Sequence, residues 1–327
     1  MEDKMVWQDR EIRFDVSNKE MATRKGEVVI ESIKNIEDTK GNPDETGTLK
    51  ITNLRLLWYS DTNSHINLSI GYDCIANIVV KISVSNNSGS VQSLYLRCKY
   101  KQSKFEFIFS SALDESQKLY ATFQAVCRSY ETTKLYRDLR LRSAIIQDKN
   151  LILLPQEKII NRYTNVWNLS ADQGNVGVFF VTNVRLVWFA NLSENFNVSV
   201  PYIQIKVIKK RESKHGTALV VETSQLSGNY VLGFQCDNLD VMLTELVKIH
   251  KIHFENPIFG VEANIQEVTK PIEEVKVKQI EEDVEIIESE YNDRQAHMSN
   301  YLTSEEKSEV NFLISMKDFF HQHNLGP

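Results

Sequence analysis

The chain lacks the short motifs that mark many enzymes and the long apolar runs that mark membrane-spanning segments. Its 327 residues contain no phosphate-binding loop, no Gly-x-Gly-x-x-Gly segment and no Gly-x-Ser-x-Gly elbow. No stretch approaches the roughly 18 apolar residues that a spanning helix needs. The N-terminal segment, MEDKMVWQDREIRFDV, has no apolar run typical of a signal peptide. We therefore expect a binding protein, not an enzyme, that carries no signal peptide.

Cysteine is scarce, and its spacing argues against a zinc site or a disulfide framework. The four cysteines, Cys74, Cys98, Cys127 and Cys236, are scattered without Cys-x-x-Cys spacing. We expect free thiols in apolar surroundings and a reducing compartment.

An excess of positive charge is also missing. The formal net charge is −6, and residues 262–290 hold ten acidic residues against three lysines, a local charge of −7. The rest of the chain therefore carries +1. A nearly neutral body with an acidic tail argues against a general nucleic-acid binder, which needs a basic surface.

One segment of the chain occurs twice. Residues 47–78 and 177–208 align without a gap, with eleven identities where composition gives roughly two. The identical pairs are Gly47/Gly177, Thr52/Thr182, Asn53/Asn183, Arg55/Arg185, Leu56/Leu186, Trp58/Trp188, Asn67/Asn197, Ser69/Ser199, Tyr72/Tyr202, Ile75/Ile205 and Ile78/Ile208. A period of this length indicates a whole small domain that was copied once.

Each copy shows alternating strand patterns followed by one amphipathic helix. Period-2 alternation predicts strands at residues 52–58 and 66–70 and again at 182–188 and 196–200. Similar patterns predict opening strands at 27–33 and 157–163 and later strands at 93–98, 105–109, 218–222 and 230–234. Apolar residues then recur at helical spacing: Leu119, Phe123, Val126 and Tyr130 in the first copy, and Leu239, Met242, Leu243, Leu246 and Ile249 in the second.

These patterns predict a mainly β chain of two tandem pleckstrin-homology-like or GRAM-like β-barrels, each closed by a C-terminal amphipathic helix. We place the first domain at residues 1–131 and the second at 150–256. Residues 132–149 are predicted as a helical linker, and residues 257–327 as an acidic extension that ends in a helix at 304–321.

Two repeated features are candidates for ligand or partner contacts. Trp58 and Trp188 could stack on a ligand, but their place on the apolar side of a strand favours the core. The pairs Asn53 with Arg55 and Asn183 with Arg185 allow two interpretations. They either order the neighbouring turn or form a repeated site for docking a partner.

A phosphoinositide site is disfavoured at the loop between the first two strands of each module. Residues 36–45 carry four acids and one lysine, and residues 168–174 carry no cation, whereas clustered phosphates need Lys and Arg. Elsewhere, five cations gather in what we predict to be a turn of the second module: Lys206, Lys209, Lys210, Arg211 and Lys214. They are our candidates for binding an anionic membrane, and the alternative is a solvated turn.

Metal binding has little support in the sequence. His250 and His253 have ligand-like spacing on the second closing helix, but no third ligand is near them in the sequence. We therefore expect no metal and no cofactor.

Several segments add a resemblance to a known family. They are residues 7–15 (WQDREIRFD), 36–42 (IEDTKGN), 52–58 (TNLRLLW), 130–138 (YETTKLYRD), 166–175 (VWNLSADQGN), 182–188 (TNVRLVW), 257–261 (PIFGV) and 283–286 (DVEI). Together they resemble the Bardet–Biedl syndrome 5 family, whose members are subunits of the ciliary cargo-adaptor complex called the BBSome. The resemblance covers about residues 7–287, and the chain departs from the family pattern from about residue 288.

The resemblance implies two tandem pleckstrin-homology-like domains and a non-catalytic role in moving membrane proteins to and from cilia. It also implies partners among the propeller and helical-repeat subunits of the complex, and contact with phosphatidylinositol 3-phosphate. The implied location is cytoplasmic, at the cilium and its basal body, and peripheral at the ciliary membrane.

Two functional hypotheses follow. In the first, the chain is an adaptor subunit, and exposed apolar residues such as Tyr59 and Phe189 become covered by partners. In the second, it is an autonomous peripheral membrane module that binds phosphoinositides.

Overall fold

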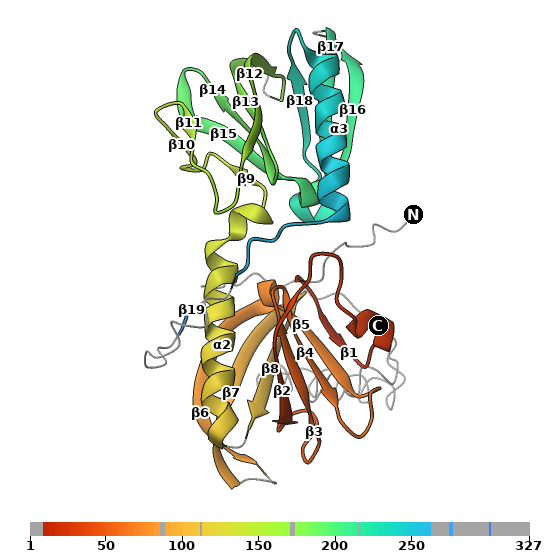
Figure 1. Ribbon diagram of the computed structural model, residues 1–327, viewed down its shortest axis with the longest axis vertical. Coiled ribbons are helices and arrows are strands. Elements are labelled where there is room, and N and C mark those ends of the chain that lie inside the picture. The colour runs from red at the N-terminus through yellow and green to blue at the C-terminus, as the bar shows by residue number, and fades with distance from the viewer. Residues whose placement is uncertain are drawn as a thin grey trace, which may run out of the picture. The chain divides into compact units, whose positions relative to one another are not determined.

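The computed structural model describes residues 9–85, 89–111, 113–170, 174–214, 216–262, 275–276 and 301. These residues fall into two compact units, one formed by 9–131 with 261–262, 275–276 and 301, and one formed by 132–260. Each unit is built on a large antiparallel sheet and a long helix (Figure 1).

The first unit contains a sheet in the order β1-β5-β4-β3-β2-β8-β7-β6-β19. Its strands are β1 (Ile12–Phe14), β2 (Val29–Asp38), β3 (Thr46–Thr52), β4 (Arg55–Ser60), β5 (Asn67–Gly71), β6 (Ile75–Ser85), β7 (Gly89–Tyr100), β8 (Ser103–Ser110) and β19 (Val275–Lys276). Its helices are α1 (Asn18–Met21), the 3-10 turn η1 (Tyr72–Cys74) and α2 (Leu113–Thr132).

The second unit repeats this plan in the order β16-β17-β18-β12-β13-β14-β15-β9, with a separate hairpin β10-β11. Its strands are β9 (Arg140–Leu141), β10 (Ile146–Gln147), β11 (Asn150–Leu151), β12 (Ile159–Asn168), β13 (Asn175–Thr182), β14 (Arg185–Ala190), β15 (Ser193–Pro201), β16 (Ile205–Ser213), β17 (Gly216–Thr223) and β18 (Val231–Gln235). Its helices are η2 (Lys134–Tyr136), η3 (Tyr202–Gln204), η4 (Gln225–Ser227) and α3 (Leu239–Glu255).

The predicted plan of successive strands followed by one closing helix is confirmed in both units. Strands β2 to β8 are followed by α2, and strands β12 to β18 are followed by α3. The apolar faces predicted for the helices are buried, with Leu119, Phe123 and Val126 at 0% exposure in α2 and Met242 and Leu246 at 0% in α3. Each helix therefore completes the core of its own sheet.

Strands β2 and β12, which occupy equivalent positions in the two modules, bend at the same place. The bend lets each of them pair with two different neighbours. The pairing of β2 with β3 shifts register between Ile33 and Ile36, and that of β12 with β13 shifts between Tyr163 and Val166. Asn35 and Asn165 have a φ of 56° at these bulges, a left-handed conformation that asparagine tolerates well. Beyond the bulge, β2 also pairs with β8, and β12 also pairs with β18.

The prediction of single strands at residues 52–58 and 182–188 is wrong at their start. Thr52 ends β3 and Arg55 begins β4, so each segment contains a hairpin turn. The Thr52 hydroxyl accepts hydrogen bonds from the backbone N–H groups of Leu54 (3.1 Å) and Arg55 (3.0 Å), and Thr182 does the same in the second module. Local hydrogen bonding by threonine therefore overrides the alternation pattern.

The two repeated tryptophans belong to the cores, as predicted. Trp58 is 0% exposed and Trp188 is 1% exposed. Their ring N–H groups donate to the carbonyls of Ile36 (2.9 Å) and Val166 (3.0 Å). A side chain at Gly177 would collide with the Phe189 carbonyl and the Trp188 ring, which explains why glycine recurs at this point of the repeat.

The cysteines lie in apolar surroundings, as predicted. Cys74, Cys98 and Cys127 are buried in the first core as free thiols, and Cys236 is half-buried. Burial raises the pKa of the Cys98 and Cys127 thiols well above the ordinary value, so these thiols stay protonated.

The predicted helical linker at residues 132–149 is wrong. After α2 ends at Thr132 the chain forms η2, the short strand β9 and the first strand of the hairpin β10-β11. Leu135, Ile145 and Ile146 pack against the outer face of β13 and β14, and this burial replaces helix formation. Most of the acidic extension and the predicted helix at 304–321 lie outside the described residues.

No helix in the described ranges is long and apolar enough to cross a membrane.

Candidate functional site

Asn53 and Asn183 lie in the hairpin turns between two strands and fasten the turn to the preceding segment. The Asn53 side chain accepts from Val28 N–H (3.0 Å) and donates to the Gly26 carbonyl (3.0 Å). Asn183 accepts from Lys158 N–H (2.7 Å) and donates to the Gln156 carbonyl (3.2 Å). Each asparagine therefore holds the start of the first strand beside the hairpin turn.

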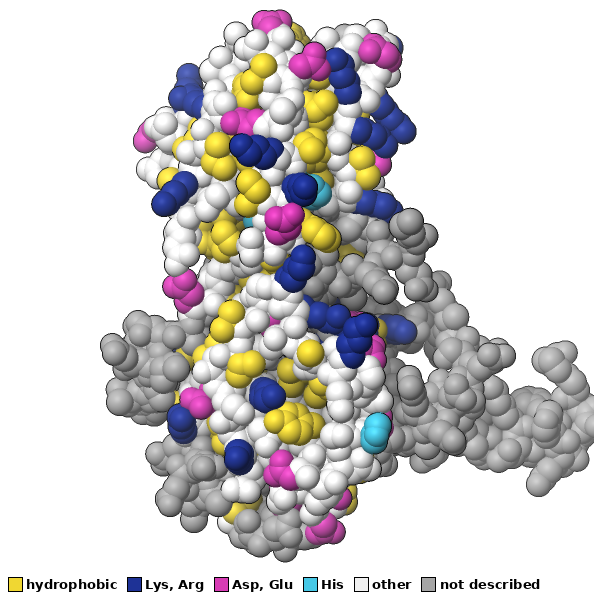
Figure 2. Space-filling model, turned by 45° about the vertical axis from the view of Figure 1, so that its right-hand side comes forward, with side chains coloured by type: hydrophobic (Ala, Val, Ile, Leu, Met, Phe, Trp, Pro, Cys, Tyr) yellow, Lys and Arg dark blue, Asp and Glu magenta, His cyan; other side chains and the backbone are white. Residues whose placement is uncertain are grey.

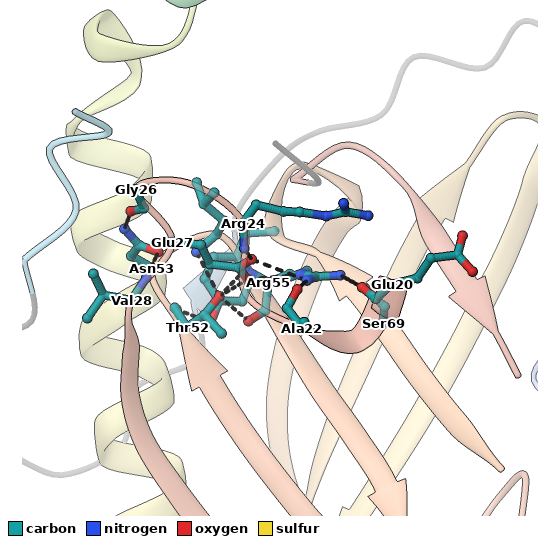
Figure 3. Close-up of polar contacts among 12 residues, drawn as sticks. Glu20, Ala22, Arg24, Gly26, Glu27, Val28, Thr52, Asn53, Arg55 and Ser69 are labelled. Atoms are coloured by element: carbon teal, nitrogen blue, oxygen red, sulfur yellow. Dashed lines mark hydrogen bonds and ion pairs between the residues drawn. The ribbon is translucent and has the colours of Figure 1, made fainter. Parts of the chain in front are cut away.

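Arg55 is fully buried and forms a two-pronged ion pair with Glu27 (Figure 3). Its Nε donates to Glu27 Oε1 at 2.8 Å and its Nη2 donates to Oε2 at 3.2 Å. The remaining N–H groups donate to the carbonyls of Glu20 (3.2 Å) and Ala22 (2.9 Å) and to the Ser69 hydroxyl (3.0 Å). The guanidinium thus ties the segment that contains α1 to the sheet.

Arg185 repeats this arrangement at the equivalent position of the second module. Its Nε donates to Glu157 Oε1 (2.8 Å), and its Nη2 donates to Glu157 Oε2 (2.9 Å) and to the Ile152 carbonyl (3.1 Å). Its Nη1 donates to the Ser199 hydroxyl at 3.2 Å. The carbonyl of Ile152 corresponds to that of Ala22, so both arginines hold the segment that precedes the first strand.

Both arginine side chains are 0% exposed, which bears on their predicted role in docking a partner. The contacts support the interpretation that these residues order the neighbouring turn, because each guanidinium nitrogen donates a hydrogen bond to a group of its own module. Docking through Asn53, Arg55, Asn183 and Arg185 remains a prediction. Because both arginines are buried, they would contribute to docking by positioning the chain segments to which they are hydrogen-bonded.

Sequence reasoning missed the acidic partners of these arginines. Glu27 and Glu157 are buried, at 7% and 5% exposure, and each also accepts a hydrogen bond from the threonine at the turn. They lie N-terminal to the aligned repeat, but the same gapless register, continued in that direction, places one opposite the other. A glutamate and an arginine therefore recur at the same offset in both copies, and this joint recurrence could have predicted the ion pairs.

The outer faces of the two central hairpins differ between the modules. In the second, Val178, Phe180, Val187 and Phe189 are covered by the hairpin β10-β11 and form a second small core with Ile145, Ile146 and Leu151. Phe189 is 0% exposed, so the prediction that it lies on an exposed surface is wrong. Its counterpart Tyr59 is half-buried and lines a cavity.

The five cations predicted to occupy a turn instead lie on or beside the edge strand β16. Lys209 pairs with Glu222 at 2.5 Å, and Lys210 pairs with Asp240 of α3 at 2.7 Å. Lys206, Arg211 and Lys214 are exposed, and Lys206 and Arg211 also lie near enough to Glu222 to help lower its pKa, after the hydrogen bond from Lys209. Figure 2 shows Lys and Arg side chains along one edge of the second unit. Membrane binding by this group remains a prediction.

In the loop that follows β2 of the first module, the single lysine already forms an ion pair. Lys40 pairs with Glu106 at 2.8 Å. Beside it, Tyr301 is fully buried, donates to Asp38 Oδ2 at 2.6 Å and lies 5.0 Å from the Phe107 ring centroid. The chain therefore fills this location with its own tyrosine. Residues 171–173 of the corresponding loop in module 2 lie outside the described ranges.

His250 and His253 lie on α3 and face its own module. A His250 ring nitrogen lies 3.2 Å from the Ile205 carbonyl, and His253 Nε2 accepts from Ile258 N–H at 3.4 Å. Burial lowers the pKa of both imidazoles, and that of His253 falls to about 4. Among the described residues, no group of three or more His, Cys, Asp or Glu side chains could hold a metal ion.

Comparison with known proteins identifies both modules. Residues 27–132 match the family model of the Bardet–Biedl syndrome 5 protein N-terminal PH-like domain, and residues 140–263 match that of its second PH-like domain. The match to the second model begins in residues predicted as a linker, in agreement with the structural unit that starts at residue 132.

Whole-chain relatives agree with the domain matches. "BBSome complex member BBS5" from Homo sapiens is 49% identical over 284 residues, which cover 86% of this chain and 83% of that protein. The Mus musculus protein of the same name is 49% identical, covering 88% and 86%. "BBSome complex member bbs-5" from Caenorhabditis elegans is 42% identical, covering 88% and 82%. Among solved structures, the Vps36 N-terminal PH domain aligns with 36% of this chain and 96% of its own length, at 11% identity and a TM-score of 0.29.

Removal of one partner of the buried ion pair should strongly destabilise the first module. Glu27→Ala leaves the Arg55 guanidinium buried without its carboxylate, and we expect a loss of about 3–5 kcal/mol in the free energy of unfolding. The matched control is Arg97→Ala, which breaks a pair with Glu106 whose arginine is 61% exposed, and should cost less than about 1 kcal/mol. Urea unfolding measures both, and equal costs would contradict the structural role of the pair.

The second module should lose stability as the pH falls from about 6.5 towards 4. His253 is neutral in the folded state because burial lowers its pKa to about 4, whereas the unfolded chain binds a proton near its ordinary value of 6.5. The loss should be on the order of 3 kcal/mol across this window and should not grow below it. Hydrogen exchange of the α3 amides at several pH values measures it. An unchanged pH slope in His253→Gln would show that another group is responsible.

Proposed function

This chain belongs to the Bardet–Biedl syndrome 5 family, and we propose that it is a non-catalytic subunit of the BBSome that supports traffic of membrane proteins to and from cilia. The observation that carries the proposal is the 49% identity to a BBSome complex member over 86% of this chain. The proposed location is the cytoplasm at the cilium and its basal body.

The use of polar groups in the two modules supports a non-catalytic role. Two buried ion pairs, Arg55 with Glu27 and Arg185 with Glu157, have structural roles within their modules. The buried thiols have a raised pKa and therefore little of the thiolate that a nucleophile needs. The modules thus resemble rigid scaffolds that present surfaces to partners.

The proposed partners are the other subunits of the complex, which the family resemblance describes as propeller and helical-repeat proteins. A module of this size offers limited surface for a stable complex, since specific interfaces bury roughly 800 Å² on each partner. Two linked modules can double that area, and linkage makes the second contact effectively intramolecular. The larger combined interface and the linkage support an adaptor that binds its partners through both modules.

Phosphoinositide contact, including contact with phosphatidylinositol 3-phosphate, is the second candidate function. It is favoured by the exposed cations on and beside β16, namely Lys206, Arg211 and Lys214. It is weakened by the ion pairs that already engage Lys209 and Lys210, because a paired lysine attracts an anionic surface less strongly. We therefore place lipid contact second to subunit docking, and an autonomous membrane module remains the alternative.

Affinity purification of the tagged chain from ciliated cells tests the adaptor proposal. We expect recovery in a fixed ratio with several large propeller and helical-repeat subunits, measured by quantitative mass spectrometry. A chain that elutes alone, while remaining folded and membrane-associated, would contradict the adaptor role and favour the membrane module.

Neutralisation of the β16 cations tests the lipid proposal. Each near-surface cation contributes on the order of 1 kcal/mol to binding an anionic membrane, so Lys206→Gln with Arg211→Gln and Lys214→Gln should weaken vesicle binding by about tenfold or more. The vesicles contain phosphatidylinositol 3-phosphate, and binding is measured by co-sedimentation at two salt concentrations. The control replaces Lys99, Lys101 and Lys104 of the first module by Gln. Equal binding by both variants would refute a lipid site on β16.

A further inference from the structure

The first module has a cavity on the outer face of its central hairpin, beneath the segment that contains α1. It measures about 250 Å³, and its lining includes Met21, Ala22, Lys50, Leu57 and Tyr59. Leu57 is buried and forms an apolar floor, while Tyr59 and Lys50 are half-buried. An apolar cavity of about 150 Å³ can hold a benzene molecule, so this one has room for a branched aliphatic side chain.

The duplicated module shows what this face binds. In the aligned repeat, the residues that correspond to Lys50, Leu57 and Tyr59 are Phe180, Val187 and Phe189. There the face is covered by Ile145, Ile146 and Leu151, which the hairpin β10-β11 brings onto it. In the second module, the equivalent strand pair β13-β14 therefore receives aliphatic side chains from a hairpin.

The cover of the first module is smaller than that of the second. Arg55 binds the carbonyls of Glu20 and Ala22, just as Arg185 binds the carbonyl of Ile152. The held segment is the short helix α1 with its flanks, and it brings only Met21 and Ala22 to the cavity as apolar groups. The cover thus walls one side of the cavity, and the half-buried side chains of Lys50 and Tyr59 border it above the buried Leu57.

At the rim of the cavity, the first module has Lys50 where the second module has Phe180. Lys50 Nζ lies 5.0 Å from the centroid of the Tyr59 ring. In the described part of the chain, Lys50 forms no ion pair, and the Tyr59 hydroxyl forms no hydrogen bond. A carboxylate placed beside them would gain a charge-assisted hydrogen bond.

We propose that this cavity is a docking pocket for one aliphatic side chain of a neighbouring subunit, presented on an extended or hairpin segment with an Asp or Glu close enough to reach Lys50. The aliphatic anchor follows from the Ile and Leu residues that fill the equivalent face, and the acid follows from the charge of Lys50. The proposal rests on the adaptor function for the identity of the partner as a subunit.

A photo-crosslinking experiment on the full chain in the purified complex tests this pocket. Tyr59 is replaced by a photo-reactive phenylalanine analogue, and the crosslinked peptide is sequenced by mass spectrometry. The matched control carries the same analogue at Tyr95, whose ring lies 5.7 Å from Lys81 Nζ in a similar arrangement away from the cavity. We expect the Tyr59 position alone to label another subunit, at a peptide with an aliphatic residue within a few positions of an acid.

Several results would overturn the proposal. With the complex intact, it fails if the Tyr59 position labels no other subunit, labels only residues of this chain, or labels only lipid. If the unmodified chain is not recovered with other subunits, the adaptor function itself fails, and the pocket assignment falls with it.

Charge reversal gives an independent readout. Lys50→Glu should weaken the labelled contact by about tenfold, because it replaces attraction of the acid by repulsion, whereas Lys81→Glu should leave it unchanged. Thermal unfolding of both variants checks that the first module stays folded. Equal binding by the two folded variants would overturn the role of Lys50 and with it the proposed acid.

Discussion

The buried pair of an arginine and a glutamate is the constraint on which both modules depend. Arg55 with Glu27, and Arg185 with Glu157, join the hairpin turn, the start of the first strand and the segment before it. A charge removed from water must be fully paired, and here every nitrogen of both guanidinium groups donates at least one hydrogen bond. The pair therefore fixes which segment covers the outer face of the central hairpin.

Both modules keep the same buried hydrogen bonds and ion pair, but they differ in what covers the outer face of the central hairpin. The Trp–carbonyl, Tyr–carbonyl and Arg–Glu contacts recur at equivalent positions, as in the hydrogen bonds from the Tyr72 hydroxyl to the Thr52 carbonyl (2.7 Å) and from the Tyr202 hydroxyl to the Thr182 carbonyl (2.9 Å). The outer face did not stay the same: Phe180 and Phe189 lie under a hairpin, whereas Lys50 and Tyr59 border a cavity. One module is closed on this side, and the other presents a site.

Periodicity was enough to predict the two modules, most of their strands and the buried faces of α2 and α3, because one-sided burial leaves a direct trace in sequence. The hairpin turns at Thr52 and Thr182 could not be predicted from alternation, since a side-chain hydroxyl ends the strand locally. The segment that contains Ile145 and Ile146 was wrongly predicted to be helical. Its conformation is set by packing against Phe180 and Phe189, which are distant in the sequence. The docking role given to Arg55 and Arg185 rested on their recurrence, which ion pairing with Glu27 and Glu157 explains equally well.

The central claim is that this chain is an adaptor subunit whose first module uses the outer face of its central hairpin to hold a neighbour. Hydroxyl-radical footprinting of the chain alone and within the purified complex measures this directly, through oxidation of Met21 and Tyr59 at the cavity and of Tyr95 elsewhere in the module. The account predicts that Met21 and Tyr59 lose reactivity in the complex while Tyr95 keeps it. Unchanged reactivity of Met21 and Tyr59 in an intact complex would contradict it.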